Sequence, residues 1–288
     1  METKPHLEFG KRTYVMGILN VTPDSFSGDG LLSRENTVRA ALEQAERYVT
    51  AGVDILDVGG ESTRPGSSVV DKTEELARVL PVIEALRASG IQTLISIDTY
   101  KAAVAEAALD LGADWINDVW ALRADPRMAQ VAAERGVPII LMHNRSKPDQ
   151  VALERRLGGS YLGSVYADLL GDVRAELMAS VAIARAAGVK DSQIILDPGI
   201  GFGKTVEQNL ALVNRLGEIR SLGFPVLLGA SRKSFIGYTL DLPPAERVEG
   251  TAAVCAVGIA RGADIIRVHD VEVMVRVARM ADAIVRTQ

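Results

Sequence analysis

The chain is poor in cysteine and histidine. Its 288 residues include one cysteine, Cys255, and three histidines. A single cysteine cannot form an internal disulfide bond, so nothing in the sequence requires an oxidising compartment. Zinc sites are built from clusters of cysteine and histidine, and so small a supply of both argues against a zinc protein.

The chain also lacks an excess of basic charge. It has 32 lysines and arginines against 37 acidic residues, a formal net charge of −5, which excludes a broad basic surface for nucleic acid or an anionic membrane. No apolar run reaches the roughly 18 residues of a membrane span, and residues 1–12 contain no apolar signal-peptide core. We therefore expect a cytoplasmic protein that holds any anionic substrate in a local site.

Aromatic residues make up only 5% of the chain, while hydrophobic residues make up 48%. Such a core depends on Ala, Val, Ile and Leu, as in layered parallel-sheet folds. Eight short runs are almost continuously apolar, a pattern typical of strands buried on both faces. These runs are 14–19, 55–58, 94–97, 115–119, 139–142, 194–196, 226–228 and 265–268.

Amphipathic stretches separate the apolar runs, and several of them end at a glycine. Helices are predicted at 34–50, 72–89, 100–111, 128–135, 166–187, 206–222, 244–261 and 271–286. Eight strand–helix units, with no linker between them, predict a single-domain (β/α)8 TIM barrel over residues 1–288. The alternative is an open doubly wound sheet, which the lack of a dinucleotide-binding fingerprint disfavours.

Two segments fall outside this repeat. Residues 144–163 are irregular, and we expect a long loop after the fifth strand. Residues 7–10 are expected to pair with the start of the first strand and close the bottom of the barrel.

Polar residues follow nearly every predicted strand. In a (β/α)8 barrel these ends converge on one mouth, where catalytic groups gather. One such aspartate could simply cap a helix, but eight coincidences indicate a site. The residues are Asn20, Asp57, Asp98, Asn117, His143, Asp197, Ser231, Arg232, Lys233, Arg267 and His269.

These residues fall into two chemical groups. Asp98, Asn117 and Asp197 offer acceptors for a heterocycle with several N–H donors. A second group could bind an anion, with arginine able to hold phosphate oxygens in a fork. Its members are Arg64, Lys233, Arg267 and His269. A flat, donor-bearing ring attached to a phosphate group would satisfy both.

Two segments, one rich in glycine and one rich in serine, are candidates for phosphate binding. Residues 198–205, PGIGFGKT, resemble a P-loop, but Pro198 stands where that motif requires glycine, so we reject a nucleotide triphosphatase. Residues 231–234, SRKS, could open a short helix whose N–H groups favour anions. Ser231 could equally act as the N-cap of that helix.

Several sequence motifs are specific enough to indicate a family. MGILNVTPDSFSGDG (16–30), DVGGESTRPG (57–66), ISIDTYK (95–101), INDV (116–119), LDPGIGFGKT (196–205), GASRKSFIG (229–237) and IIRVHDV (265–271) occur in this order. Together they resemble the dihydropteroate synthase family of pterin-binding TIM barrels, nearly end to end. The resemblance implies a transferase that condenses (7,8-dihydropterin-6-yl)methyl diphosphate with p-aminobenzoate and releases diphosphate in folate synthesis.

The resemblance also implies residue roles. Asp98, Asn117, Asp197 and Lys233 would bind the pterin, and Arg267 and His269 the diphosphate, with Asp98, Lys233, Arg267 and His269 counted as catalytic. Thr63, Arg64, Phe202 and Ser231 would also bind substrate, Ser231 at the p-aminobenzoate carboxylate. Asn20 would contact the Mg²⁺ that accompanies the diphosphate. The family further implies a homodimer, and two loops, 27–30 and 65–68, over the second substrate.

Some alternatives stay open at this level. Asp57 could orient its neighbours instead of touching substrate, and His143 is better explained as a satisfied strand-end histidine than as a base. Two other proteins would share the pterin pocket: a methyltransferase barrel that works with a corrinoid protein, and a non-catalytic pterin-binding paralogue. Lys233, Arg267 and His269 argue against the methyltransferase. The presence of Asn20, Asp197, Lys233 and the RVHD string at 267–270 argues against the non-catalytic paralogue.

Overall fold

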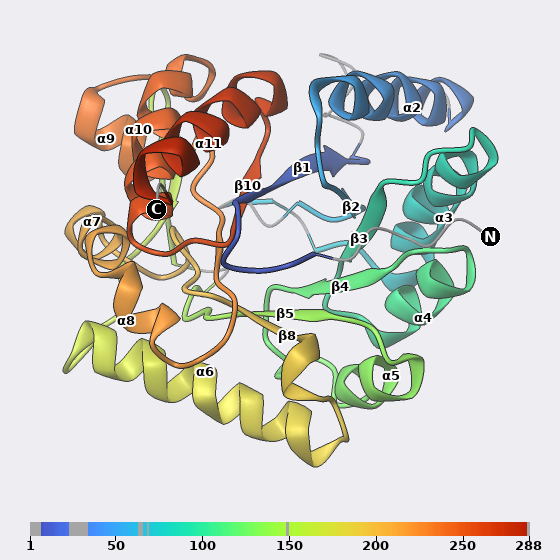
Figure 1. The fold of residues 1–288 in the computed structure, drawn as a ribbon, viewed down its shortest axis with the longest axis horizontal. Coiled ribbons are helices and arrows are strands. Elements are labelled where there is room, and N and C mark those ends of the chain that lie inside the picture. The colour runs from blue at the N-terminus through green and yellow to red at the C-terminus, as the bar shows by residue number, and fades with distance from the viewer. Residues whose placement is uncertain (1–6, 23–33, 63–65, 68, 148–149, 287–288) are drawn as a thin grey trace.

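Eight parallel strands form the centre of the molecule, and helices surround them (Figure 1). The structure is a computed structural model that describes residues 7–22, 34–62, 66–67, 69–147 and 150–286. The strand order is β8-β5-β4-β3-β2-β1-β10-β9. A parallel bridge between Leu196 and Val226 joins the two ends of this sheet, and Leu196 N–H donates to Pro225 O over 2.9 Å. The predicted barrel is confirmed, and the open doubly wound sheet is excluded.

The strands of the barrel match the eight apolar runs to within one residue at either end. They are β1 (Tyr14–Asn20), β2 (Ile55–Gly59), β3 (Leu94–Asp98), β4 (Trp115–Asp118), β5 (Ile139–Met142), β8 (Ile194–Asp197), β9 (Leu227–Leu228) and β10 (Ile265–Val268).

Helices follow the predicted stretches, with two interruptions. They are α2 (Arg34–Ala51), α3 (Lys72–Ala88), α4 (Ala102–Asp110), α5 (Met128–Arg135), α6 (Leu169–Ala186), α7 (Val206–Asn214), α8 (Leu216–Arg220), α9 (Ser234–Leu240), α10 (Val248–Ala260) and α11 (Val271–Val285), with 3-10 turns η1 (Asp191–Gln193) and η2 (Pro244–Glu246). The stretch 206–222 is broken at Arg215, and 244–261 is broken at Arg247. Within the described residues, none of these helices has the length and apolar character to cross a membrane.

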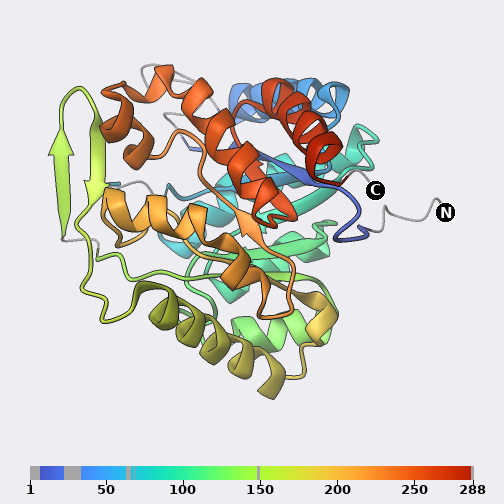
Figure 2. The same cartoon turned by 60° about the vertical axis from the view of Figure 1, so that its left-hand side comes forward.

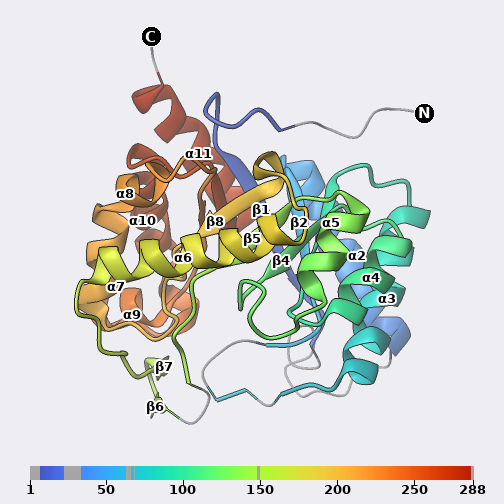
Figure 3. The same ribbon diagram turned by 90° about the horizontal axis from the view of Figure 1, so that it is seen from below.

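The segment 144–163 is not the plain loop expected from the sequence. It contains an antiparallel hairpin, β6 (Val151–Glu154) and β7 (Gly158–Tyr161). Figure 2 shows the hairpin standing beside the barrel, and Figure 3 places it at the end opposite the last turn of α11. Arg247, some 90 residues later, donates from Nη2 to Leu157 O over 2.7 Å. Because this hydrogen bond joins residues far apart in the chain, no local sequence pattern indicates it, and the hairpin was therefore not predicted.

Residues 7–10 cover the bottom of the barrel without forming a strand. The Tyr14 hydroxyl donates to Glu8 O over 3.1 Å and accepts from Glu8 N over 2.7 Å. Leu7 and Phe9 pack on the apolar interior, with the Phe9 ring edge-on to Tyr14 at 5.8 Å. The predicted closure is correct, but side chains provide it instead of a β-ladder.

The barrel interior changes character along its axis. Near the bottom the inward side chains form one apolar cluster: Tyr14, Met16, Ile55, Leu94, Trp115, Ile140, Ile195, Leu227 and Ile265. Two residues further along each strand, the inward positions become polar in most strands, because side chains alternate between the two faces. The polar end is the mouth, where the carboxyl ends of the strands meet.

Candidate functional site

A cavity of about 530 Å³ opens at the mouth. Eight of the predicted mouth and site residues line it: Asn20, Asp98, Phe202, Ser231, Arg232, Lys233, Arg267 and His269. Asn117 and Asp197 lie just below, at the ends of β4 and β8, and both are buried. Thr63 and Arg64, and the loop residues 27–30, 65 and 68, lie outside the described residues.

One arginine links the acidic side chains of the mouth. Arg267 on β10 donates from Nε to Asp57 Oδ2 over 2.5 Å and from Nη2 to Asp98 Oδ2 over 2.6 Å. Asn117 Nδ2 also donates to Asp57 Oδ2, over 3.1 Å. Asp57 is fully buried and does not line the cavity. Asp57 therefore orients Arg267 and Asn117, the first of the two roles that the sequence left open.

Burial makes the carboxyl groups of Asp98 and Asp197 weak acids. It raises the pKa of Asp98 to about 7, an effect that Arg267 opposes and Asp57 reinforces. Burial likewise raises the pKa of Asp197 to about 6, against the Gly199 N–H and Lys233. For Arg267, burial alone would lower the pKa, but Asp57 and Asp98 outweigh it and raise the pKa. The mouth thus holds carboxyl groups that a ligand with several N–H donors can keep ionised.

Asp197 both shapes a turn and faces the site. Its Oδ1 accepts from Gly199 N–H over 2.7 Å, so the carboxylate does cap the glycine-rich turn. Gly199 has φ +68°, and a Cβ there would lie 1.7 Å from His143 O, so only glycine fits. The second oxygen, Oδ2, lies 3.5 Å from the position of a Cβ on Gly229 and is the atom left for a ligand.

An aromatic and apolar cluster forms one wall of the mouth. The Lys233 ammonium lies 3.9 Å from the centre of the Phe202 ring, and the Tyr161 ring of the hairpin stacks on Phe202 at 6.0 Å. Val119, Met142, Phe202, Tyr100, Trp120 and Tyr161 make up this cluster. The cluster offers a flat apolar surface beside the carboxylates, which suits a planar ring.

Ser231 holds His269. The Ser231 hydroxyl accepts from the His269 backbone N–H over 3.1 Å and lies 3.0 Å from His269 Nδ1. The short helix predicted after residues 231–234 is α9, but its N-cap residue is Lys233. The capping role considered for Ser231 is therefore wrong, because the helix starts three residues after it.

Sequence reasoning missed three parts of this site. Leu157, Gly158 and Gly159 of the hairpin line the cavity, as does Arg247. Lys204 lies below the mouth with 3% exposure and contacts His143 Nδ1 at 3.0 Å. His143 itself is buried away from the cavity. The expected satisfied strand-end histidine is correct only in part, because Nδ1 contacts Lys204 while the buried Nε2 has no hydrogen-bond partner in the described structure. A lysine inside a glycine-rich turn was the one signal available for Lys204.

The mouth combines buried hydrogen-bond acceptors, a planar aromatic wall and the basic side chains of Lys233 and Arg267, which together suit a flat ring with N–H donors. Residues 16–269 match the pterin binding enzyme family, so the chain belongs to the class of pterin-binding barrels. The chain is 50% identical to dihydropteroate synthase of Bacillus subtilis, over 98% of this chain and 93% of that protein. It is also 50% identical to the Synechocystis dihydropteroate synthase, over 97% and 92%.

Solved structures agree. A dihydropteroate synthase from Clostridium difficile, determined in the presence of pteroic acid, has a TM-score of 0.89 and 47% identity, covering 98% of this chain and 100% of that one. The Xanthomonas albilineans enzyme with 4-aminobenzoic acid has a TM-score of 0.86 and 40% identity, covering 96% and 94%. The chain belongs to the dihydropteroate synthase family. Its reaction is the condensation of (7,8-dihydropterin-6-yl)methyl diphosphate with p-aminobenzoate, and it is a transferase of folate synthesis.

Proposed function

We propose that the pterin ring lies in the mouth against Asp98, Asn117 and Asp197, with Lys233 beside it and the diphosphate at Arg267 and His269. The observation that carries this arrangement is Arg267, which bonds two buried carboxylates and also lines the cavity. An arginine held in this way keeps N–H groups for a phosphate oxygen while it neutralises the wall that receives the ring.

Departure of the diphosphate would be assisted by charge already in place. The carbon that reacts is a methylene on an electron-rich ring, so it can release diphosphate and leave a cation delocalised into the pterin. Asp98 and Asp197 favour positive charge on the ring, while Arg267 and His269 favour the departing anion. The arylamine then forms the new C–N bond and loses a proton. A neutral aromatic amine needs no strong base for this step.

A magnesium ion fits this donor set if the diphosphate brings it. Among the described residues, no cluster of three or more His, Cys, Asp or Glu could hold a metal alone. Asn20 lines the cavity and presents an amide oxygen, a hard ligand of the kind that Mg²⁺ takes together with substrate phosphates and water. Bound there, the ion would neutralise charge on the leaving group.

Replacement of Asp197 tests the pterin site. In Asp197→Asn the side chain keeps its size and can still accept from Gly199 N–H through Oδ1, but the amide turns a donor toward the ligand. We expect pterin affinity to fall at least about tenfold, since an unpaired buried donor costs roughly 1–3 kcal/mol. Calorimetric titration of the variant and the wild type with a pterin measures this affinity.

Asp118 supplies the matched control. It is a fully buried carboxylate at the end of β4 that accepts from Trp120 N and Leu122 N over 2.8 and 2.7 Å. Asp118→Asn should lower the melting temperature and leave pterin affinity unchanged. Unchanged affinity in a folded Asp197→Asn protein would rule out the proposed pterin site.

Release of diphosphate separates the remaining alternatives. A synthase releases it only when both substrates react, whereas a corrinoid-dependent methyltransferase and a non-catalytic paralogue release none. We expect release that depends on p-aminobenzoate, measured with a coupled diphosphate assay.

We also propose a cytoplasmic homodimer of single-domain subunits, formed by helices away from the mouth. Exposed apolar side chains on α10 and α11, among them Val257, Met280 and Ile284, support such a contact. Sedimentation velocity of wild type against Ile284→Glu tests it, and a monomeric wild type would contradict it.

A further inference from the structure

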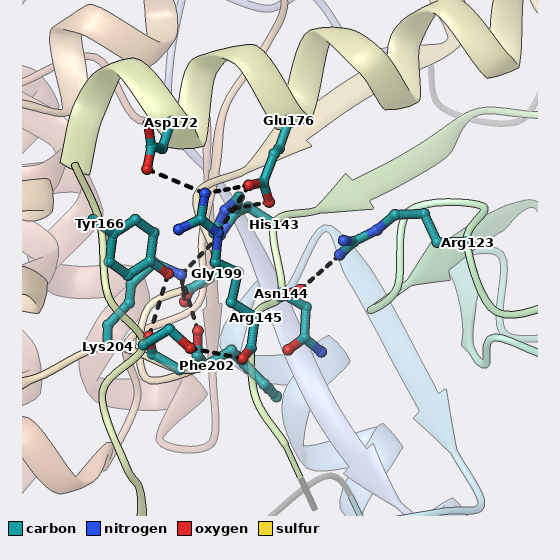
Figure 4. A network of polar contacts seen from close by, with 12 residues as sticks. Arg123, His143, Asn144, Arg145, Tyr166, Asp172, Glu176, Gly199, Phe202 and Lys204 are labelled. Carbon is teal, nitrogen blue, oxygen red and sulfur yellow. Dashed lines mark hydrogen bonds and ion pairs between the residues drawn. The ribbon is translucent and has the colours of Figure 1, made fainter. Parts of the chain in front are cut away.

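Lys204 is a buried cation whose three donors all have acceptors. Its Nζ lies 2.8 Å from Gly199 O, 3.1 Å from Phe202 O and 3.0 Å from His143 Nδ1 (Figure 4). An ammonium carries three N–H groups and no lone pair, so the match is complete. His143 can accept only as the neutral tautomer with its proton on Nε2.

The neutral state of His143 has a clear physical origin. Burial, then the neighbouring charges of Lys204 and Arg123, lower the pKa of His143 to about 2. The other ring nitrogen, Nε2, lies 3.1 Å from Glu176 Oε2 on α6, without the alignment of a hydrogen bond. His143 therefore serves Lys204 as an acceptor throughout the physiological range.

Lys204 closes the turn that carries the mouth residues. The turn contains three left-handed glycines, Gly199, Gly201 and Gly203, with φ of +68°, +84° and +67°. Glycines at such angles leave a backbone with little resistance to rearrangement. The ammonium binds carbonyl groups from both halves of the turn and so fixes one half against the other.

Both ends of the fixed turn reach the proposed pterin site. At one end Gly199 N–H donates to Asp197 Oδ1 over 2.7 Å. At the other, the Phe202 ring lies under the Lys233 ammonium, and a Cβ on Gly201 would lie 3.0 Å from Lys233 Cδ. Lys204 itself does not line the cavity, so it would act only through these neighbours.

We propose that Lys204 is a positioning residue for pterin binding: it holds the 199–203 turn so that Asp197, Phe202 and Lys233 keep the spacing that the ring requires. This inference rests on the proposed pterin site. It assigns no contact between Lys204 and the substrate.

Lys204→Met tests the proposal, because methionine has similar length and no donors. We expect the dissociation constant of the pterin to rise about tenfold, as for the loss of buried hydrogen bonds to a charged group. The Michaelis constant for the pterin substrate should rise in parallel. That for p-aminobenzoate, measured at saturating pterin, should change less than about threefold.

Arg87→Met is the matched control. Arg87 is a basic side chain bonded to backbone carbonyls of Gly112, Ile91 and Thr93 and to Asp114, at the bottom of the barrel. It should lower the melting temperature and leave pterin affinity intact. Unchanged affinity in Lys204→Met, or an equal loss in both variants, would overturn the proposal. Lys204→Gln, which keeps an amide donor, should give an intermediate loss and serves if the methionine variant does not fold.

The pH profile of pterin affinity gives a readout that a purely structural role would not move. Burial lowers the pKa of Lys204 to about 7, with Asp197 opposing and Lys233 adding to the shift, and with Glu176 and Arg145 facing it from the side of α6. Affinity in the wild type should fall as the pH rises above about 7. The ligand's own ionisation affects the wild type and Lys204→Met alike, so only the wild type should show this additional fall in affinity above about pH 7. An identical fall in both proteins would contradict the role of the ammonium.

Asp197→Asn separates the two levels of inference. If that variant keeps its pterin affinity, the proposed pterin site fails. If Asp197→Asn loses affinity and Lys204→Met does not, only the inference about Lys204 fails.

Discussion

The bottom and the mouth of the barrel are built by the same strands and differ in almost every physical respect. Ile55 is followed two residues later by Asp57, Ile195 by Asp197, and Ile265 by Arg267, all on the inner face. Leu7 and Phe9 close the bottom, and the interior cluster they pack on consists of apolar side chains, whereas charge at the mouth is buried and paired. The inward residues that form the apolar core and those that form the site are thus about two residues, or roughly 7 Å, apart along each strand.

The largest effect should come from breaking the charge balance of the mouth. Arg267→Ala leaves Asp57 and Asp98 without their shared partner, and we expect a loss of about 3–5 kcal/mol of unfolding free energy. Affinity for the pterin diphosphate should fall further than affinity for the free pterin. Urea denaturation and calorimetry with both ligands measure the two effects. Equal losses for the two ligands would show that Arg267 does not contact the diphosphate, and Arg267→Lys, which keeps the charge, should be milder.

A change at the bottom should affect stability alone. Ile195 is 1% exposed within the apolar interior. Ile195→Ala should cost about 3 kcal/mol of unfolding free energy by leaving a cavity, and Ile195→Val about 1 kcal/mol. Pterin affinity of the folded variants should equal that of the wild type. A marked loss of affinity would mean that the two ends are coupled and that the separation proposed above is wrong.

The smallest effect is a pH dependence of stability. Burial raises the folded-state pKa of Asp197 to about 6, above the ordinary value near 4, so the folded protein binds more protons between these limits. This group therefore makes the wild type less stable as the pH rises from about 4 to about 6. Asp197→Asn removes this penalty, so it should be more stable than the wild type at pH 7 and gain little near pH 4. Melting curves at the two pH values check it, and a gain independent of pH would refute the assignment.

The sequence predicted the strands well because each is buried on both faces and so is almost continuously apolar. It also predicted the mouth residues, since parallel strands bring their carboxyl ends together. It could not predict that Arg267 bonds Asp57 and Asp98, which lie 210 and 169 residues away, because barrel register decides that contact. The hairpin could not be predicted for the same reason, because its anchor Arg247 is remote in the chain. The same holds for the contact between Lys204 and His143, which lie 61 residues apart.

The two ends of the barrel also differ optically. The chain has two tryptophans, and one lies at each end. Trp115 is buried in the apolar bottom, while Trp120 lies partly exposed in the cluster with Phe202 and Tyr161. Fluorescence of Trp115 therefore reports on the integrity of the fold, and that of Trp120 on events at the mouth. Replacing either tryptophan by phenylalanine leaves a single-tryptophan protein, whose fluorescence reports on the other end of the barrel without any added label.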